Sequence, residues 1–407
     1  MLKSDDNFYE PSYFYMKLDT TKLLKDIISS DEESVLIHEY IHLLQDISIE
    51  TNRNMMWQNV NNYRALSKEI LEKGNTKRPI ECHEENILIN SKVNDSLWGT
   101  DANIKNGEII DIKIINEEIA DRIKRKAIYL IVLSNGKEIQ YKLGRRDFIE
   151  SMALAIENYI YKIQNDDISD FPYRSIENIL KFKKIKTTSF IVSQICELAL
   201  SSYDPVGSLI RYFDKGKNKT STQEIYDAMY TGMKITNYDG SIHSIEENQK
   251  YVFNESKIML LDWFQTPLFH NIKEWLSFIL DFGYSMRLSN KIFLSSILTL
   301  PPTKSRRLIH SYIIKTGIPV VYNKNYDVQI VDPSLKNVDT FLLLALNTLY
   351  TYLKSSMINC NLFCFCEKAK ETIVDDNCHY NIMARLKKEK LCPMAVWIKT
   401  FKFQDLE

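Results

Sequence analysis

Residues 34–48, SVLIHEYIHLLQDIS, place two histidines four positions apart, with a glutamate directly after the first. Residues four apart on an α-helix lie one turn above each other on the same face, so His38 and His42 are expected to point the same way. Valine, isoleucine and leucine fill many of the other positions, which predicts a helix buried on nearly every side. Ser30 and Glu33 have the spacing of a capping box, which predicts that the helix begins there.

The histidine pair and its glutamate are the residue types of a zinc site. Each imidazole can bind the same ion at about 2.0–2.1 Å. Glu39 lies about 100° around the helix from His38, where it can take a proton from water whose pKa zinc lowers to around 7. The alternative is a pair of core histidines satisfied by backbone carbonyls, or a solvent-facing stripe. Because such groups need partners in a buried helix, we favour a Zn²⁺ site.

The motif HEYIH in a buried helix resembles the active-site helix of the zincin superfamily of zinc metallopeptidases. The resemblance covers this one helix. It implies that His38 and His42 are zinc ligands and that Glu39 is the catalytic base. One zincin branch has a third histidine on an extended motif, but Gln45 and Ser48 stand here where that motif has glycine and histidine. The chain therefore departs from that branch.

A catalytic zinc site has a third protein ligand and one open position. The gluzincin branch takes a glutamate from a later helix, often followed by small residues, because two helices must approach closely for a glutamate to reach the metal. Glu150, in FIESMALAIE, begins the run Glu-Ser-Met-Ala and is similar to that pattern, so we expect it to be the third ligand. Glu157, two turns further along, and Glu197, in ICELALSS, remain alternatives.

The transition state of such a reaction also needs a hydrogen-bond donor aimed at the developing oxyanion, typically a tyrosine, histidine or arginine. The sequence does not choose among His243, His270, His310 and Tyr203. Gln45 and Asp46, about one turn beyond His42, could orient a histidine or simply lie on the surface.

A second group of metal-binding residue types lies near the C-terminus. Within residues 360–392 it comprises Cys360, Cys364, Cys366, Cys378, His379 and Cys392. This density could form a structural zinc site. However, the C-x3-C-x-C spacing does not match the C-x2-C knuckles of zinc fingers, and free cysteines are among the most buried residues. We favour buried thiols and keep the second metal as the alternative.

Hydrophobic periodicity divides the chain into three zones. Residues 1–75 open with the strand-like SYFYMKL and continue as helices around the histidine motif. Residues 76–146 become β-branched and aromatic, and Asn135-Gly136 between two such runs predicts a type I′ hairpin. Residues 147–407 return to helical spacing, with Asp147 as the expected first cap. The predicted fold is mainly α with a small inserted antiparallel β-sheet. Further helices are expected near residues 53–73, 188–202, 221–235, 270–286, 303–315 and 338–356.

Composition restricts the class of protein. The 407 residues are 44% hydrophobic with a formal net charge of −1, which provides for a large core and gives no reason to expect nucleic acid as a partner. The most apolar windows are shorter than the roughly 18 residues of a membrane span. Seven cysteines without an export signal predict reduced thiols in the cytoplasm. The basic runs KFKKIK and RIKRK are most simply solvated faces.

Together these features predict a cytoplasmic zinc-dependent metallopeptidase that hydrolyses peptide bonds of a protein or peptide. One alternative is a zinc hydrolase with the same site that acts on a non-peptide amide. The other is a non-enzymatic interaction protein in which the histidine pair only braces the core.

Overall fold

The structure is a computed structural model that describes residues 7–28, 30–120, 123–163, 168–216, 219–236, 242–331, 341–356, 360–368, 374–386, 388 and 392–403. It is mainly helical with small sheets, as the sequence predicts. No helix among these residues is long and apolar enough to cross a membrane.

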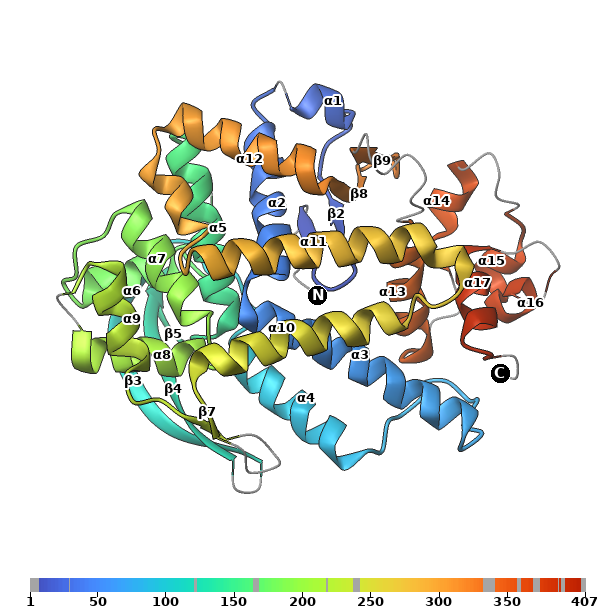
Figure 1. Cartoon of the computed structure of the whole chain (residues 1–407), viewed down its shortest axis with the longest axis horizontal. Coiled ribbons are helices and arrows are strands. Elements are labelled where there is room, and N and C mark those ends of the chain that lie inside the picture. The colour runs from blue at the N-terminus through green and yellow to red at the C-terminus, as the bar shows by residue number, and fades with distance from the viewer. Residues whose placement is uncertain are drawn as a thin grey trace.

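The helices follow the chain from the N-terminus to the tail (Figure 1). They are α1 (Leu24–Ile27), α2 (Glu33–Ser48), α3 (Glu50–Leu71), α4 (Glu85–Trp98), α5 (Arg145–Tyr161), α6 (Ser175–Phe182), α7 (Ser189–Ala199), α8 (Pro205–Gly216), α9 (Thr222–Tyr230), α10 (Ile245–Asp262), α11 (His270–Ser289), α12 (Pro302–Thr316), α13 (Phe341–Leu353), α14 (Phe363–Lys368), α15 (Asn377–Tyr380), α16 (Ile382–Leu386) and α17 (Pro393–Thr400). The helices expected near residues 188–202, 221–235, 270–286 and 303–315 are confirmed, whereas α4 and α10 were not predicted. Residues 338–340 of the last expected helix lie outside the described residues.

Helix α2 lies at the centre of the fold. It packs against α3, α5 and α11, and Figure 1 shows α11 crossing in front of it. The contact with α11 is close, because a Cβ atom added at Gly283 would lie only 2.3 Å from the carbonyl oxygen of Ile47. Almost every residue of α2 is buried, as its nearly continuous apolar sequence predicts.

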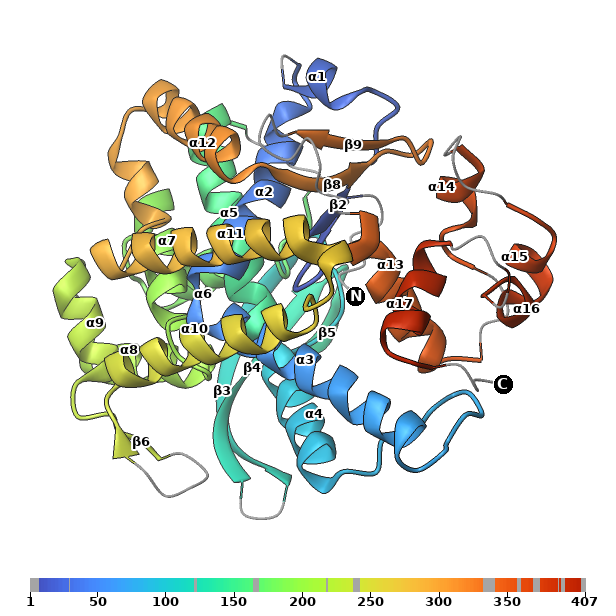
Figure 2. The ribbon, with the colours of Figure 1, turned by 45° about the vertical axis from the view of Figure 1, so that its right-hand side comes forward.

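One sheet joins the two ends of the chain. Its strand order is β1 (Phe8–Glu10), β2 (Tyr15–Lys17), β8 (Ile318–Tyr322), β9 (Val328–Val331). Strand β2 lies within the segment SYFYMKL and pairs in parallel with β8, about 300 residues later, with Met16 opposite Val321. Figure 2 shows β8 and β9 beside α2. The N-terminal strands thus depend on a segment near the opposite end of the chain.

The inserted sheet consists of β3 (Gly107–Ala120), β4 (Ile123–Ser134) and β5 (Lys137–Lys142), all antiparallel. Asn135 and Gly136 both have positive φ, 50° and 74°, which confirms the expected type I′ turn. A further short pair, β6 (Ile235–Thr236) and β7 (Ile242–His243), lies before α10.

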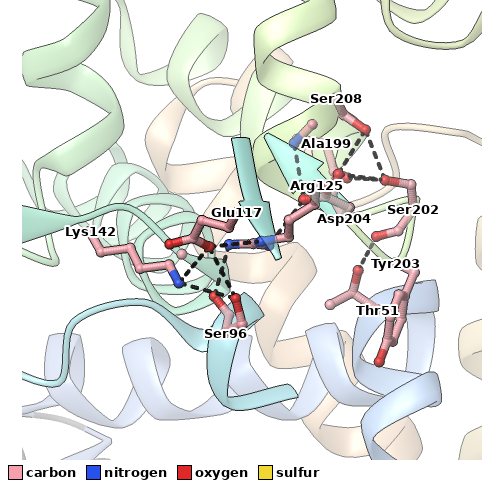
Figure 3. Close-up of polar contacts among 12 residues, drawn as sticks. Thr51, Ser96, Glu117, Arg125, Lys142, Ala199, Ser202, Tyr203, Asp204 and Ser208 are labelled. Carbon is pink, nitrogen blue, oxygen red and sulfur yellow. Dashed lines mark hydrogen bonds and ion pairs between the residues drawn. The ribbon is translucent and has the colours of Figure 1, made fainter. Parts of the chain in front are cut away.

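Polar side chains attach the inserted sheet to the helices (Figure 3). Arg125 of β4 donates to the carbonyl of Ser96 in α4 at 2.8 Å, and its guanidinium lies 3.5 Å from Asp204, directly before α8. Glu117 of β3 pairs with Lys142 of β5 at 2.8 Å. The Arg125 side chain is nearly buried, so these contacts satisfy a charge that would otherwise be costly to enclose.

Two helix starts differ from the prediction. Helix α2 begins at Glu33 without a side-chain cap, and the Ser30 hydroxyl donates to the carbonyl of Ile27. The Glu33 carboxylate does not reach back to a cap; it pairs with Arg306 and His310 of α12. Helix α5 begins at Arg145, and Asp147 occupies its third position, where it accepts from the backbone N–H of Gly144 at 2.8 Å. In both cases tertiary partners or neighbouring backbone determine the start of the helix.

Candidate metal centre

Two buried helices bring the predicted ligands together. His38 and His42 lie one turn apart on α2, with their ring centroids 4.9 Å apart. Glu150 projects from α5, which packs on α2. Small side chains follow Glu150 in sequence, Ser151 and Ala153, and both are buried. The close helix approach expected of a glutamate ligand is therefore present.

The distances among the three side chains fit one small cation. Glu150 Oε2 lies 3.3 Å from His38 Nε2 and 3.5 Å from His42 Nε2. The three ligand atoms lie within 4.8 Å of one another, and no other such group of three occurs among the described residues. Metal bonds of about 2.0–2.1 Å with tetrahedral angles would separate ligand atoms by about 3.3–3.4 Å. The observed separations are close to this value.

Hydrogen bonds fix the orientation of both imidazoles. His38 Nδ1 lies 2.9 Å from Glu157 Oε2, and His42 Nδ1 lies 2.8 Å from Gln45 Oε1. Gln45 is itself held, because its amide donates to the carbonyl of Ile149 at 3.0 Å. A ligand histidine commonly donates its second ring N–H to such an acceptor, which directs the lone pair of the other nitrogen at the metal. Here both Nε2 atoms face Glu150.

The charges around the histidines are unbalanced. Burial lowers the pKa of His38, but its hydrogen bonds to Glu150 and Glu157 outweigh burial and hold this pKa well above its usual range. Burial also opposes ionisation of Glu150, yet His42 and His38 hold its pKa below its usual range. When the two imidazoles are neutral, as metal binding requires, the carboxylates of Glu150 and Glu157 have no compensating charge in this buried site. A divalent cation would neutralise part of this charge.

Glu39 lies beside this centre and is not engaged elsewhere. It is 5% exposed, and no hydrogen bond or ion pair to another described residue occupies its carboxylate. Burial raises the pKa of Glu39 to about 7, although His42 and His38 partly offset the effect. A carboxyl group of this kind can both accept and return a proton near neutral pH.

A small pocket opens next to His42. Asp46, one turn further along α2, accepts from the Tyr9 hydroxyl at 2.9 Å and from the Ser12 backbone N–H at 2.8 Å. Asp46 therefore holds the N-terminal segment that forms one wall of the pocket, and it does not orient a histidine. The pocket is lined by Tyr9, Pro11, His42, Gln45, Asn52, Met55, Trp98 and Ile149.

Glu157 and Glu197, the alternative third ligands, have other partners. Glu157 orients His38, as described above. Glu197 is fully buried and pairs with Arg287 at 3.0 Å, while its second oxygen accepts from the backbone N–H of Ser295 at 2.8 Å. Its carboxylate belongs to a separate polar cluster that joins α7 to α11.

The four candidate oxyanion donors lie in other polar contacts. His310 pairs with Glu33 at 2.6 Å, and Tyr203 donates to Asn94 at 3.2 Å. His270 is exposed beside Glu274, and His243 lies 4.0 Å from Glu247.

Tyr173 is a residue that the sequence did not single out. Its ring centroid lies 6.0 Å from that of His38. It precedes α6 in an irregular segment, so no periodicity marks it, and only the tertiary structure brings it to the centre. Its hydroxyl makes Tyr173 the tyrosine to test as an oxyanion donor.

No family model, curated protein or solved structure matches the chain.

Proposed function

We propose that the chain is a zinc-dependent metallopeptidase of gluzincin type, with His38, His42 and Glu150 as ligands and Glu39 as catalytic base. The observation that carries the proposal is the complete arrangement around one point. Glu150 lies 3.3 and 3.5 Å from the two imidazole nitrogens, and each histidine has its own orienting acceptor. Among the described residues, none forms a hydrogen bond or ion pair with the carboxyl group of Glu39 beside them. A histidine pair that only braced the core would not need the last feature.

His38, His42 and Glu150 would hold a zinc ion, which would polarise a carbonyl group and make water a stronger acid. Glu39 would accept the proton of the attacking water and return it to the leaving nitrogen. Glu157 and Gln45 keep the imidazoles in the ligating orientation throughout.

The pocket beside His42 is the expected entry for the substrate. We propose a protein or peptide of the same reducing compartment, consistent with seven cysteines that are all free. One observation favours a second candidate, hydrolysis of a smaller non-peptide amide. The pocket is small, and the four central residues are only 4–8% exposed, so a long substrate needs a wider opening.

The experiment compares the wild-type chain with Glu39→Gln after both are loaded with zinc. A quenched-fluorescence peptide library is screened for cleavage, and bound zinc is counted in the same preparations. We expect cleavage by the wild type, a loss of about 100-fold to 10,000-fold in Glu39→Gln, and equal zinc in both.

The matched control is Glu33→Gln, a neighbouring buried glutamate of α2 that pairs with α12 instead of facing the centre. It should keep both zinc and activity if it folds. Undiminished cleavage in Glu39→Gln would reject the mechanism. Zinc binding without peptide cleavage, together with cleavage of small amides, would select the second candidate.

A further inference from the structure

Four cysteines of the tail surround one pocket. Cys360 precedes α14, Cys366 lies in α14, Cys378 lies in α15, and Cys392 precedes α17. All four line the same pocket, whose remaining walls are mostly apolar side chains together with Arg385. Figure 2 shows the short helices that carry them grouped at one end of the molecule. The two other candidates of this region do not line the pocket.

Those two residues provide an internal contrast. Cys364 lies in α14 between Cys360 and Cys366, yet it is not part of the lining. His379 stacks on Phe363, with ring centroids 3.6 Å apart, and is also absent from the lining. Of the six residues in this region that could bind a metal, only these four cysteines therefore line the pocket.

Two of these sulfur atoms have neighbours within hydrogen-bond range of sulfur. The Cys360 thiol lies 3.7 Å from Met394 Sδ. The backbone N–H of Ala395 donates to Cys392 Sγ at 3.4 Å. Hydrogen bonds to a charged acceptor are stronger than those to a neutral one, so the contact at Cys392 suits a thiolate better than a thiol.

Thiolates at these positions nevertheless need a cation. The other walls of the pocket are mostly apolar, so thiolates without a counter-charge would be costly there. Arg385 lines the pocket but supplies only one positive charge. A metal ion deprotonates coordinating thiols outright.

The helices of this region are short. A bound metal would therefore have a structural role, because it would hold them together. Helices α14, α15 and α16 have 6, 4 and 5 residues, too few to be stable without tertiary support. Structural metal sites with four cysteine ligands contribute directly to the folding of such small units.

We propose that Cys360, Cys366, Cys378 and Cys392 bind a metal centre through their four thiolates. This site is separate from the centre between α2 and α5 and does not depend on the proposed function. Two metal centres share this ligand chemistry. A tetrahedral zinc ion requires sulfur atoms about 3.8 Å apart, whereas a [4Fe–4S] cluster holds four thiolates at wider spacing. Among the described residues, no three of these sulfur atoms lie within 4.8 Å of one another, so zinc would have to draw the segments inward.

The test measures zinc, iron and acid-labile sulfide in the full chain purified without oxygen. The variants are Cys366→Ser and Cys392→Ser, with Cys364→Ser as the matched control, all in a His42→Ala background that removes the first centre. We expect either one zinc, or about four irons with sulfide, in His42→Ala and in the Cys364→Ser control. Both pocket variants should lose that metal. Metal content that is the same in Cys366→Ser and Cys364→Ser would overturn the proposal.

A second measurement does not depend on how the variants fold. When Co²⁺ replaces zinc in the wild-type chain, thiolate ligands produce an intense near-ultraviolet charge-transfer band, which two histidines and a glutamate cannot produce. The zinc form of the site predicts this band, and the iron form predicts broad visible absorption before any cobalt is added. A wild-type chain that shows neither signal has no thiolate centre.

Discussion

The centre between α2 and α5 and the cysteine pocket of the tail bring their proposed metal ligands together in different ways. His38, His42 and Glu150 lie on helices of 16 and 17 residues whose faces are buried, and hydrogen bonds hold both imidazoles in place. The four cysteines lie on or beside very short helices and surround a pocket without converging. Long packed helices can position ligands before an ion binds, whereas short segments need the ion to complete their arrangement.

The largest expected effect comes from removing a proposed ligand of the centre between α2 and α5. We expect His42→Ala and Glu150→Gln to lose stoichiometric zinc, a larger effect than the roughly 10–100-fold that changes around the ligands cause. Equilibrium dialysis against a competing chelator measures the affinity.

Glu197→Gln is the matched control for Glu150→Gln, because it is an equally buried glutamate in a separate cluster. It should keep its zinc, although it is expected to lower the melting temperature by weakening the contact with Arg287. Equal zinc affinities in the two variants would argue against Glu150 as a ligand.

Chelation should separate the two regions. Removal of metal from the wild type is expected to leave α2 and α5 packed, since their contacts do not include the ion. The tail should loosen, so that the pocket cysteines react with an alkylating reagent several-fold faster than in the metal-bound chain. Mass spectrometry of the labelled peptides measures both regions in one sample. If chelation leaves the labelling rate of the pocket cysteines unchanged, the tail does not depend on a metal ion for its structure, and the proposed difference between the two regions is wrong.

Glu157→Gln tests how far hydrogen bonding prepares the first centre. The amide oxygen can still accept from His38 Nδ1, but the negative charge is lost. We therefore expect zinc affinity to fall about tenfold, at the low end of the range for such residues. Glu177→Gln, at the surface of α6 beside Lys181, should leave the affinity unchanged. A tenfold loss of zinc affinity in both variants would show that the change in net charge, and not the contact with His38, causes the loss.

Gly283→Ala tests whether the packing around α2 matters. The added methyl group would meet the carbonyl of Ile47 at 2.3 Å, so α11 must shift away from α2. Overpacking of this kind costs about 1–3 kcal/mol of unfolding free energy, measured by urea denaturation. Ser285→Ala, on the exposed side of the same helix, should cost much less. An equal loss of unfolding free energy in the two variants would mean that the close approach of α11 to α2 at Gly283 does not contribute to stability.

Local sequence patterns predicted those elements that are determined by interactions between residues close together in the sequence. The buried helix with His38 and His42 follows from its apolar sequence, and the hairpin follows from Asn135-Gly136. Glu150 was favoured because small residues follow it, and the structure does place it beside the histidines. The choice against Glu197 required knowing that Arg287 lies next to it.

The remaining features depend on contacts between distant segments. Strand β2 gives no sign of its partner β8, since the two are about 300 residues apart. Ser30 and Glu33 matched a capping box, but Arg306 and His310 bind the glutamate instead. The tail spacing resembled no known zinc finger because its four cysteines come from three separate segments, around α14, in α15 and before α17.

The position of α2 in the chain also affects how the protein is made. Helix α2 leaves the ribosome well before its partners α5 and α11 and the strand β8, which follow it in the chain. Contacts between segments so far apart in sequence form slowly, and the buried faces of α2 are exposed until they do. Nascent chains that end before α11 are therefore expected to expose these apolar faces and to depend on chaperones. Assembly of the proposed metal centre between α2 and α5 is in this way coupled to synthesis of the later segments that cover it.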